Sequence, residues 1–560
     1  MALAFASFAL MVAACAPAAS GPAGPGTAQG SVAPEVNRRP LVIAINREPS
    51  ILETSMLPQP RDEAGLMTAF LAMIDGQQQA HPYLAAELPT VAAGTWKLLP
   101  DGRMETTYKL RPNATWHDGA PLTAEDFVFA HRVRLEPDFP GFSTTLEYRV
   151  SRAVALDPHT LLLEWKEPYL WAGMLHLPNF SPMPRHRVEQ IYTDNREAFL
   201  TGAHWRDQFV HAGPYRVSRW EPGVELVLDA FPGFVLGAPA LQQVIIRFMP
   251  DPNTVVANLL GGTVDMSWAA TIGFQQAQAL EQSGWRGRVA YWSGNPRIVQ
   301  FQARDWPGVQ RAVLDPRARR ALLHGVDRAS LVDAVFGGRG RPFHFWLHPT
   351  DPAYPAVDRA VAKYEYDPTR AEALLREAGW VKGGDGVARN GAGEPLTVPI
   401  NNQPGDQEAQ EGSIVADNWK QIGVPTELKR VTPQELRDGE MRSKYPAMAY
   451  ERRNLALDNM VWTISEISRP ENRWTGSNRN GWSNQAFDDL WRRVLGTIDL
   501  AEREGLLVQA LGIMQDDAYV TLTHLQAAVT AYDSALTGPA EPSSVGNAET
   551  WNAYQWRWSS

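Results

Sequence analysis

Residues 109–134 read KLRPNATWHDGAPLTAEDFVFAHRVR, and this stretch carries dense local structural signals. Pro112 ends an extended segment, because proline has no backbone N–H to donate to a sheet. The run His117–Gly119 predicts a tight turn, since glycine readily adopts a positive φ angle. Thr123 and Asp126 have the spacing of a capping box at the start of a helix. The stretch therefore predicts a strand, a turn and a capped helix, with no catalytic group.

The same stretch closely resembles the signature of the family 5 solute-binding proteins of ABC importers. The family pattern reads L-R-x-x-x-x-[FW]-H-D-G-x-P-[LF]-T-A-x-D-V. The matching positions are Leu110, Arg111, Trp116, His117, Asp118, Gly119, Pro121, Leu122, Thr123, Ala124 and Asp126. Phe127 departs from the pattern, because the family usually has valine there. Members of the family bind peptides, nickel chelates and related solutes.

Further family-like segments follow in order, so that the resemblance covers roughly residues 41–535. They include His211–Val217 (HAGPYRV), Arg317–Gly340 (RARRALLHGVDRASLVDAVFGGRG) and Tyr366–Trp380 (YDPTRAEALLREAGW). Capping and periodicity alone indicate an α/β or α+β protein with several lobes. The resemblance implies a more specific fold class. It is an α/β, two-lobe, periplasmic-binding-protein-like fold of type II, in the large peptide-binding class with an extra subdomain.

The resemblance also implies a division of the chain. Lobe 1 is expected to comprise residues 41–288 plus 521–560, and lobe 2 residues 289–520, with two crossovers near positions 289 and 520. A block of short strands predicts a subdomain of lobe 1 over about residues 88–188.

The composition is that of a soluble globular protein. The 560 residues are 44% hydrophobic and 20% charged, which is enough for large cores. The formal net charge of −10 argues against a nucleic-acid-binding protein, because there is no basic excess to neutralise phosphates. The 20 tryptophans and 15 tyrosines either fill the core or form a cleft that stacks on ligands.

The start of the chain resembles a lipoprotein leader. Residues 2–14 (ALAFASFALMVAA) are apolar but too short to span a bilayer. Cys15 follows Val-Ala-Ala, which fits a bacterial lipobox whose cysteine is diacylated; the alternative is a lone buried cysteine. We expect a signal peptide over residues 1–15, a flexible tether over residues 16–40, and a location in the periplasm or at the cell surface.

An enzyme is the competing class, but common catalytic patterns are absent from the sequence. It contains no G-x-S-x-G, H-E-x-x-H or G-x-x-x-x-G-K-[ST] motif and no cysteine cluster. His344 and His348 are four residues apart, but Pro342 and Pro349 disfavour a helix that would direct both to one metal. We therefore predict no catalytic residue, no metal site and no cofactor. Carboxylates that meet only in space could still form an acid–base pair.

Ligand contacts are expected in an interlobe cleft. Peptide-binding relatives hold the ligand's ammonium group with an aspartate in the segment that aligns with residues 450–462 (YERRNLALDNMVW), but the usual W-x-x-D-x-x-D-P pattern is missing. Asp458 is the candidate that remains, and Arg452 and Arg453 are unexpected cations beside it. If these residues line the cleft, the ligand carries an anionic group that a guanidinium can bind. Alternatively the arginines are solvated, Asp458 caps a helix and Trp462 belongs to the core.

Two further candidates lie elsewhere in the sequence. Arg297 lies in the expected crossover, and Glu48 lies in a segment that resembles the family's E-P-x-x-L-D loop at the mouth of the cleft. The expected partners are a peptide or small-molecule ligand and an ABC permease complex, and the expected state is a monomer. The alternatives are a receptor or chaperone of the same fold that takes no part in transport, and a hydrolase acting in the cleft.

Overall fold

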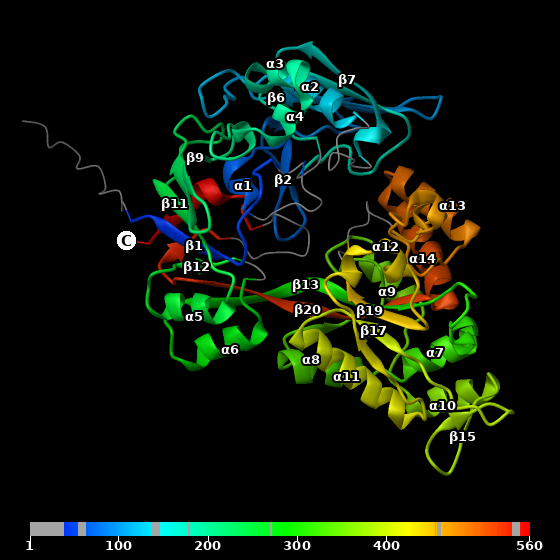
Figure 1. Cartoon of the computed structure of the whole chain (residues 1–560). Helices are drawn as coiled ribbons and strands as arrows, with labels where there is room; N and C mark the ends of the chain where they lie inside the picture. Colours follow the sequence, from blue (N-terminus) through cyan, green and yellow to red (C-terminus); the bar gives the residue numbers. More distant parts are fainter. Residues whose placement is uncertain are drawn as a thin grey trace, which may run out of the picture. The chain divides into compact units, whose positions relative to one another are not determined.

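The computed structural model describes residues 39–53, 56, 63–136, 146–176, 180–268, 271–453, 455, 461–539 and 549–559. These residues form a mixed α/β fold around one 11-stranded sheet, shown in Figure 1. In spatial order its strands are β18 (Leu428–Arg430), β17 (Ile400–Asn402), β19 (Met448–Arg452), β13 (Arg288–Phe301), β20 (Val520–Tyr532), β12 (Met266–Ser267), β1 (Leu41–Ile45), β11 (Gln243–Phe248), β10 (Glu225–Ala230) and β9 (Tyr215–Glu221), with β14 (Arg341–Pro342) paired to β20.

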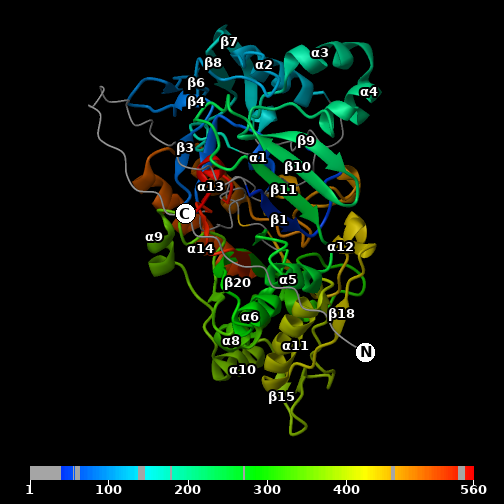
Figure 2. The same cartoon turned by 90° about the vertical axis from the view of Figure 1, so that its left-hand side faces the viewer.

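Strand β1 lies in one end of this sheet. It pairs in parallel with β11 and β12, and β10 and β9 continue the sheet antiparallel, as Figure 2 shows. Leu41 and Ile43 pack into one core cluster, whereas Ala44 packs into another. Cover on both faces explains why β1 reads as a continuous apolar run.

The other end of the sheet is built from parallel strands. Strand β17 runs parallel to both β18 and β19. Helices α7 (Pro316–His324), α8 (Arg328–Phe336), α10 (Pro368–Glu377) and α11 (Asp406–Gln421) share one hydrophobic core with these strands. Asp315, Asp327 and Asp367 cap the first three helices by accepting backbone N–H hydrogen bonds.

Strands β13 and β20 join the two ends of the sheet. They pair antiparallel from Arg288 opposite Tyr532 to Gln300 opposite Val520. The β12 strand pairs with one end of β20, and β19 pairs with the other end of β13. The register between β13 and β20 shifts between Ser293 and Pro296 and again between Arg297 and Ile298, so the pairing of the two strands is irregular there.

The signature stretch forms the strand, turn and helix that the sequence predicts. Strand β6 (Met104–Leu110) belongs to a separate sheet in the order β4-β6-β8-β7, with β4 (Ala85–Glu87), β7 (Val150–Asp157) and β8 (Thr160–Trp165). Gly119 has φ +88°, and Thr123 and Asp126 form the capping box of α2 (Ala124–Arg134). The ring of His117 is buried and its Nε2 lies 3.0 Å from the carbonyl oxygen of Gly213. The signature therefore docks this sheet to the segment that precedes β9.

Two helices that pack against each other precede β20. They are α13 (Gln485–Gly496) and α14 (Leu500–Asp517), and Asp499 caps α14 by accepting a hydrogen bond from the backbone N–H of Glu502.

The first and last described segments lie against each other. The indole Nε1 of Trp558 donates to the carbonyl oxygen of Arg39 at 3.0 Å, and the Arg39 guanidinium lies 4.4 Å from the centre of the Trp558 ring. Arg39 also forms an ion pair with Asp265.

Candidate functional site

The carboxyl ends of β17, β18 and β19 meet at one edge of the sheet, because these strands are parallel. In open α/β sheets, ligands bind outside such carboxyl ends. Gln403 follows β17, Arg430 ends β18 and Arg452 ends β19. On β13, Arg297 lies directly opposite Arg452. This edge therefore brings together two of the predicted site residues and is the candidate functional site.

Arg297 is fully enclosed and already neutralised within the protein. Its Nε lies 2.5 Å from Oε2 of Glu411, and its Nη2 lies 3.0 Å from Oε1 of Glu408. Both carboxylates come from the first half of α11. Burial alone would raise the pKa of Glu411, but the charge of Arg297 and the contact with His524 outweigh it and hold the pKa at about 2. Glu411 is therefore charged at neutral pH, and Arg297 supports the site from inside.

Arg452 differs from Arg297 although the two face each other across the strands. Its side chain is exposed, and within the described residues no carboxylate lies at ion-pair distance from it. Gln403 connects the pair, because its Oε1 accepts from the backbone N–H of Arg452 at 2.8 Å and from Nη1 of Arg297 at 3.2 Å. The Arg452 guanidinium is thus available to a ligand at the carboxyl edge.

Arg453 and Trp462 lie together behind this edge. The Arg453 guanidinium lies 5.8 Å from the centre of the Trp462 ring and donates to the carbonyl oxygen of Ser477 at 3.2 Å. Trp462 is fully buried and packs edge-on against Trp346 with ring centres 5.3 Å apart. Trp462 is therefore a core residue, and its ring packs against the Arg453 guanidinium.

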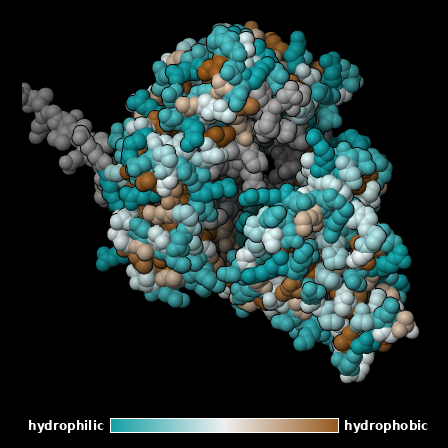
Figure 3. Space-filling model, viewed as in Figure 1, coloured by the Kyte–Doolittle hydropathy of each residue, from teal (hydrophilic) through white to brown (hydrophobic). Residues whose placement is uncertain are grey.

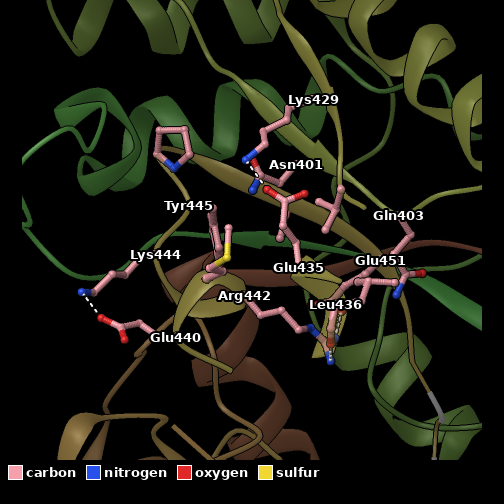
Figure 4. Close-up of a pocket in the computed structure, with 14 residues that line it drawn as sticks. Asn401, Gln403, Lys429, Glu435, Leu436, Glu440, Arg442, Lys444, Tyr445 and Glu451 are labelled. Atoms are coloured by element: carbon pink, nitrogen blue, oxygen red, sulfur yellow. Dashed lines mark hydrogen bonds and ion pairs between the residues drawn. The ribbon is translucent and has the colours of Figure 1, made fainter. Parts of the chain in front are cut away.

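A pocket of about 280 Å³ lies next to these residues, and α12 (Gly439–Ser443) forms part of its wall. Figure 4 shows the side chains that converge on it. Its lining residues are Asn401, Gln403, Lys429, Val431, Glu435, Leu436, Glu440, Met441, Arg442, Lys444, Tyr445, Pro446, Ala449 and Glu451.

The charged groups of the pocket are paired with one another. Lys429 lies 3.0 Å from Glu435, Lys444 forms an ion pair with Glu440, and Nη2 of Arg442 lies 2.7 Å from Oε2 of Glu451. The apolar part of the lining includes Leu436 and Met441. A site with an apolar wall and a few directed polar groups can hold an amphipathic small solute.

Glu48 occupies a different part of the fold. Its carboxylate accepts hydrogen bonds from the Trp220 indole Nε1 at 2.7 Å and from the backbone N–H of Gly223 at 3.0 Å. It therefore ties the loop after β1 to the β9–β10 turn. Asp458 and Cys15 lie outside the described residues.

The sequence analysis missed Glu451, Arg442 and Gln403. A glutamate inside the buried strand MAYER, directly before two arginines, is a signal that was available. Arg442 and Gln403 carry no such signal, because only the packing of α12 and the end of β17 brings them here.

His344 and His348 have separate partners rather than a shared one. His348 Nδ1 lies 2.7 Å from Nε2 of Gln78, in the turn between β2 (Ala72–Ile74) and β3 (Ala80–Pro82), whereas His344 Nε2 lies 3.8 Å from Glu365. Burial lowers the pKa of His344 to about 3 and that of His348 to about 4. Across the described ranges, no group of three or more potential metal ligands occurs.

The described helices include none that is long and apolar enough to cross a membrane. Figure 3 shows a face that is mostly hydrophilic, with hydrophobic residues scattered among polar ones.

The chain matches the profile of a family described as "Bacterial extracellular solute-binding proteins, family 5 Middle" over residues 88–477. The oligopeptide-binding protein AppA of Bacillus subtilis is 25% identical over 340 residues, which are 59% of this chain and 59% of AppA. The di/tripeptide-binding protein 2 of Pseudomonas aeruginosa is 24% identical over 482 residues, which are 79% of this chain and 82% of that protein.

A solved structure supports the same fold. The oligopeptide-binding protein from Thermus thermophilus, complexed with a pentapeptide, superimposes with a TM-score of 0.70 at 22% sequence identity, covering 92% of this chain and 96% of that chain. The predicted fold class, a two-lobe type II periplasmic-binding-protein fold, is thereby confirmed.

Proposed function

Because the chain belongs to family 5 of the bacterial extracellular solute-binding proteins, we propose that it captures a peptide or similar small solute outside the cytoplasm and delivers it to an ABC importer. The match over residues 88–477 carries this proposal. Peptides are the first choice of solute, since AppA and the Pseudomonas relative are named for peptides. Nickel chelates, sugars and haem are the other solutes to test.

The proposed mechanism is closure of two lobes over the solute. Lobe 1 comprises residues 41–288 plus 521–560 with a subdomain over about 88–188, and lobe 2 comprises residues 289–520. The β13–β20 ribbon is the connection, and its irregularity between Ser293 and Pro296 is the bending point. Solute that contacts both lobes stabilises the closed state, so affinity and closure are linked.

In this proposal the solute lies at the carboxyl edge of β17 and β19. Arg452 contacts it directly, Arg297 and Trp462 support the edge, and Asp458 remains a candidate for the solute's ammonium group. Glu48 is a candidate on lobe 1, through the loop it organises. No residue is assigned a catalytic role.

The experiment starts from the protein as it is isolated. Mass spectrometry of the denatured protein identifies the solute that co-purifies, and calorimetry with that solute measures its affinity. Small-angle scattering then compares the free and saturated protein. We expect a smaller radius of gyration in the complex; an unchanged radius at saturation contradicts lobe closure.

Two further experiments, one with the isolated protein and one with cells, separate the rival functions. A hydrolase would convert a peptide library into products, which chromatography detects. A receptor without a transport role would bind the solute, yet deletion of its gene would leave solute uptake by the cells unchanged. Stable peptides together with impaired uptake are the expected results.

The proposed anchor is a lipid on Cys15, the only cysteine of the chain. Cells expressing the protein with labelled palmitate should label the wild type and not Cys15→Ala. Equal labelling of both proteins, or of neither, contradicts the lipoprotein assignment. Light scattering of protein lacking the leader tests the proposed monomer.

A further inference from the structure

Two arginines pair with one carboxylate on β19, and the charge of a third acts on it. Arg442 Nη2 lies 2.7 Å from Glu451, and Arg453 Nη2 lies 3.5 Å from it. The guanidinium of Arg479 is near enough to influence the charge of the same carboxylate. Gln300 donates to Glu451 from the neighbouring strand β13. We call Glu451, Arg442, Arg453 and Arg479 the arginine cluster.

The arginine cluster has an excess of positive charge in a poorly solvated place. Only 14% of the Arg453 side chain and 8% of the Glu451 side chain are exposed. Burial opposes ionisation of Glu451, but Arg453, Arg442 and Arg479 outweigh it and lower its pKa to about 2. Burial, with repulsion from Arg453, lowers the pKa of Arg479 to about 9. All four groups are thus charged at neutral pH.

Several N–H donors of these guanidinium groups have no hydrogen-bond acceptor among the described residues. Nε of Arg453 and both Nε and Nη1 of Arg479 are buried without a hydrogen-bond partner among the described residues. The nearby carboxylates are committed elsewhere, since Glu435 pairs with Lys429 and Glu440 with Lys444. Buried N–H donors that lack an acceptor are costly, and a bound acceptor group would relieve that cost.

The pocket described above adjoins this cluster, since Arg442 and Glu451 are part of its wall. In Figure 4, the Arg442 and Glu451 side chains lie side by side at the pocket. Its volume of about 280 Å³ equals roughly nine water molecules in the liquid, enough for an amino-acid side chain. Oδ1 of Asn401 and the hydroxyl of Tyr445 are also buried here, without partners among the described residues.

We propose that this pocket and the arginine cluster form a subsite for a carboxylate of the solute, so that the protein prefers acidic peptides or other carboxylate-bearing solutes. The inference rests on the proposed function, because it concerns the same carboxyl edge. A bound carboxylate would balance the excess charge and accept charge-assisted hydrogen bonds from the guanidinium groups.

The test uses alanine peptides of two to five residues in which one alanine is replaced by glutamate or by glutamine. Calorimetry compares each glutamate peptide with its glutamine counterpart, which differs only in charge. We expect the best glutamate peptide to bind about 10- to 100-fold more tightly than its counterpart. High salt should reduce this preference for glutamate only slightly, because the arginine cluster is shielded from solvent. A preference that came from an exposed site would be reduced much more.

The variants are Arg479→Gln and Arg453→Gln, with Arg479→Lys as the charge-retaining form. Arg389→Gln is the matched control. Arg389 is a surface arginine on β16 (Ala388–Arg389), and it forms an ion pair with Asp385. Each Gln variant should lose most of the glutamate preference, and Arg479→Lys should retain part of it. The melting temperature of unliganded Arg479→Gln should not fall, because the variant removes excess charge; a purely structural arginine would lower it.

A second measurement keeps the inference separate from the proposed function. Melting temperatures are recorded with N-acetylglutamate, with its amide and with inorganic phosphate. If no peptide binds but N-acetylglutamate stabilises the wild type and not Arg479→Gln, the subsite stands and the peptide proposal fails. If phosphate acts equally well, the subsite is for anions in general and the carboxylate assignment is wrong.

Two results overturn the subsite itself. Peptides that bind equally well with glutamate and glutamine would remove it while leaving the solute-binding function intact. Absence of any response to peptides, N-acetylglutamate and phosphate would overturn the subsite and the choice of peptides as the solute, and would leave the other solutes to test.

Discussion

Arg297 and Glu411 form an ion pair in which neither side chain is exposed, with Nε 2.5 Å from Oε2. A buried pair of this kind is not in itself a source of stability, because both charges have left water. It does make each partner dependent on the other. The facing residue on β19, Arg452, has no such partner in the described part of the chain and is exposed. One strand pair therefore holds an internal cation and a cation open to ligands.

The first prediction concerns this internal pair. Arg297→Met leaves Glu411 buried without its main counter-charge and should lower the free energy of unfolding by about 3–5 kcal/mol. Urea denaturation at pH 7 measures the loss. Arg452→Met is the matched control and should change stability by less than about 1 kcal/mol. A loss in Arg297→Met no larger than in this control contradicts the structural role of Arg297.

The second prediction concerns acid stability at His131 on α2. The ring is buried against Phe180, and neither of its nitrogens has a hydrogen-bond partner among the described residues. Burial lowers the pKa of His131 to about 4, below the unfolded value of about 6.5. The unfolded state therefore binds the proton first, and the stability from keeping this ring neutral is full above pH 6.5 and lost as the pH falls toward 4.

His131→Leu should remove this pH dependence. Up to about 3 kcal/mol of acid-induced loss should disappear, so the variant should melt higher than the wild type at pH 5 and close to it at pH 7.5. Thermal melts across that range provide the measurement, with the half-buried His159→Leu as control. Parallel curves for wild type and His131→Leu would show that His131 does not contribute to the acid response.

The third prediction concerns charge at the carboxyl edge. Arg452→Ala should weaken binding of the co-purified solute by about 2–3 kcal/mol, roughly 30- to 150-fold, if the guanidinium bonds to the solute in the closed state. Asp458→Ala should have a similar effect. A solvated surface charge would contribute well under about 1 kcal/mol, and salt would mask it. Calorimetry measures the affinity of both variants. If both bind the solute as tightly as the wild type, this segment is not the binding site, and Glu48 is the next candidate.

The fourth prediction concerns the contact of Gln78 with His348 and Thr350. In the proposed division this contact joins the two lobes, so its loss should favour the open state. Gln78→Ala should reduce affinity about fivefold, as expected for one hydrogen bond, without lowering the melting temperature by more than a degree or two. The exposed neighbour Gln79→Ala is the control. Unchanged affinity in Gln78→Ala would mean that this contact does not hold the lobes closed.

Local structure was predictable from the sequence where a few neighbouring residues determine it. The capping box of Thr123 and Asp126 and the turn at Gly119 both form as predicted. In each case the interacting groups are no more than a few residues apart. The fold class followed from the resemblance rather than from these signals.

The site was less predictable, because its partners are distant in the chain. Arg297 was a candidate ligand contact, yet Glu408 and Glu411, more than a hundred positions later, neutralise it. Trp462 was a candidate too, and it packs on Trp346 in the core. The strand register and the position of α11 against the sheet determine which side chains meet, and neither can be read from a single sequence.

The contact between Arg39 and Trp558 has a practical consequence for engineering. Since the two ends of the described chain touch, a short linker from Ser559 back to Arg39 would close the polypeptide into a ring with little strain. The chain could then be reopened at an exposed turn such as Gly384–Asp385, which gives a circular permutant with the same strands in a new order. A reporter protein inserted at the new ends would lie at this exposed turn, where it could serve in a solute sensor.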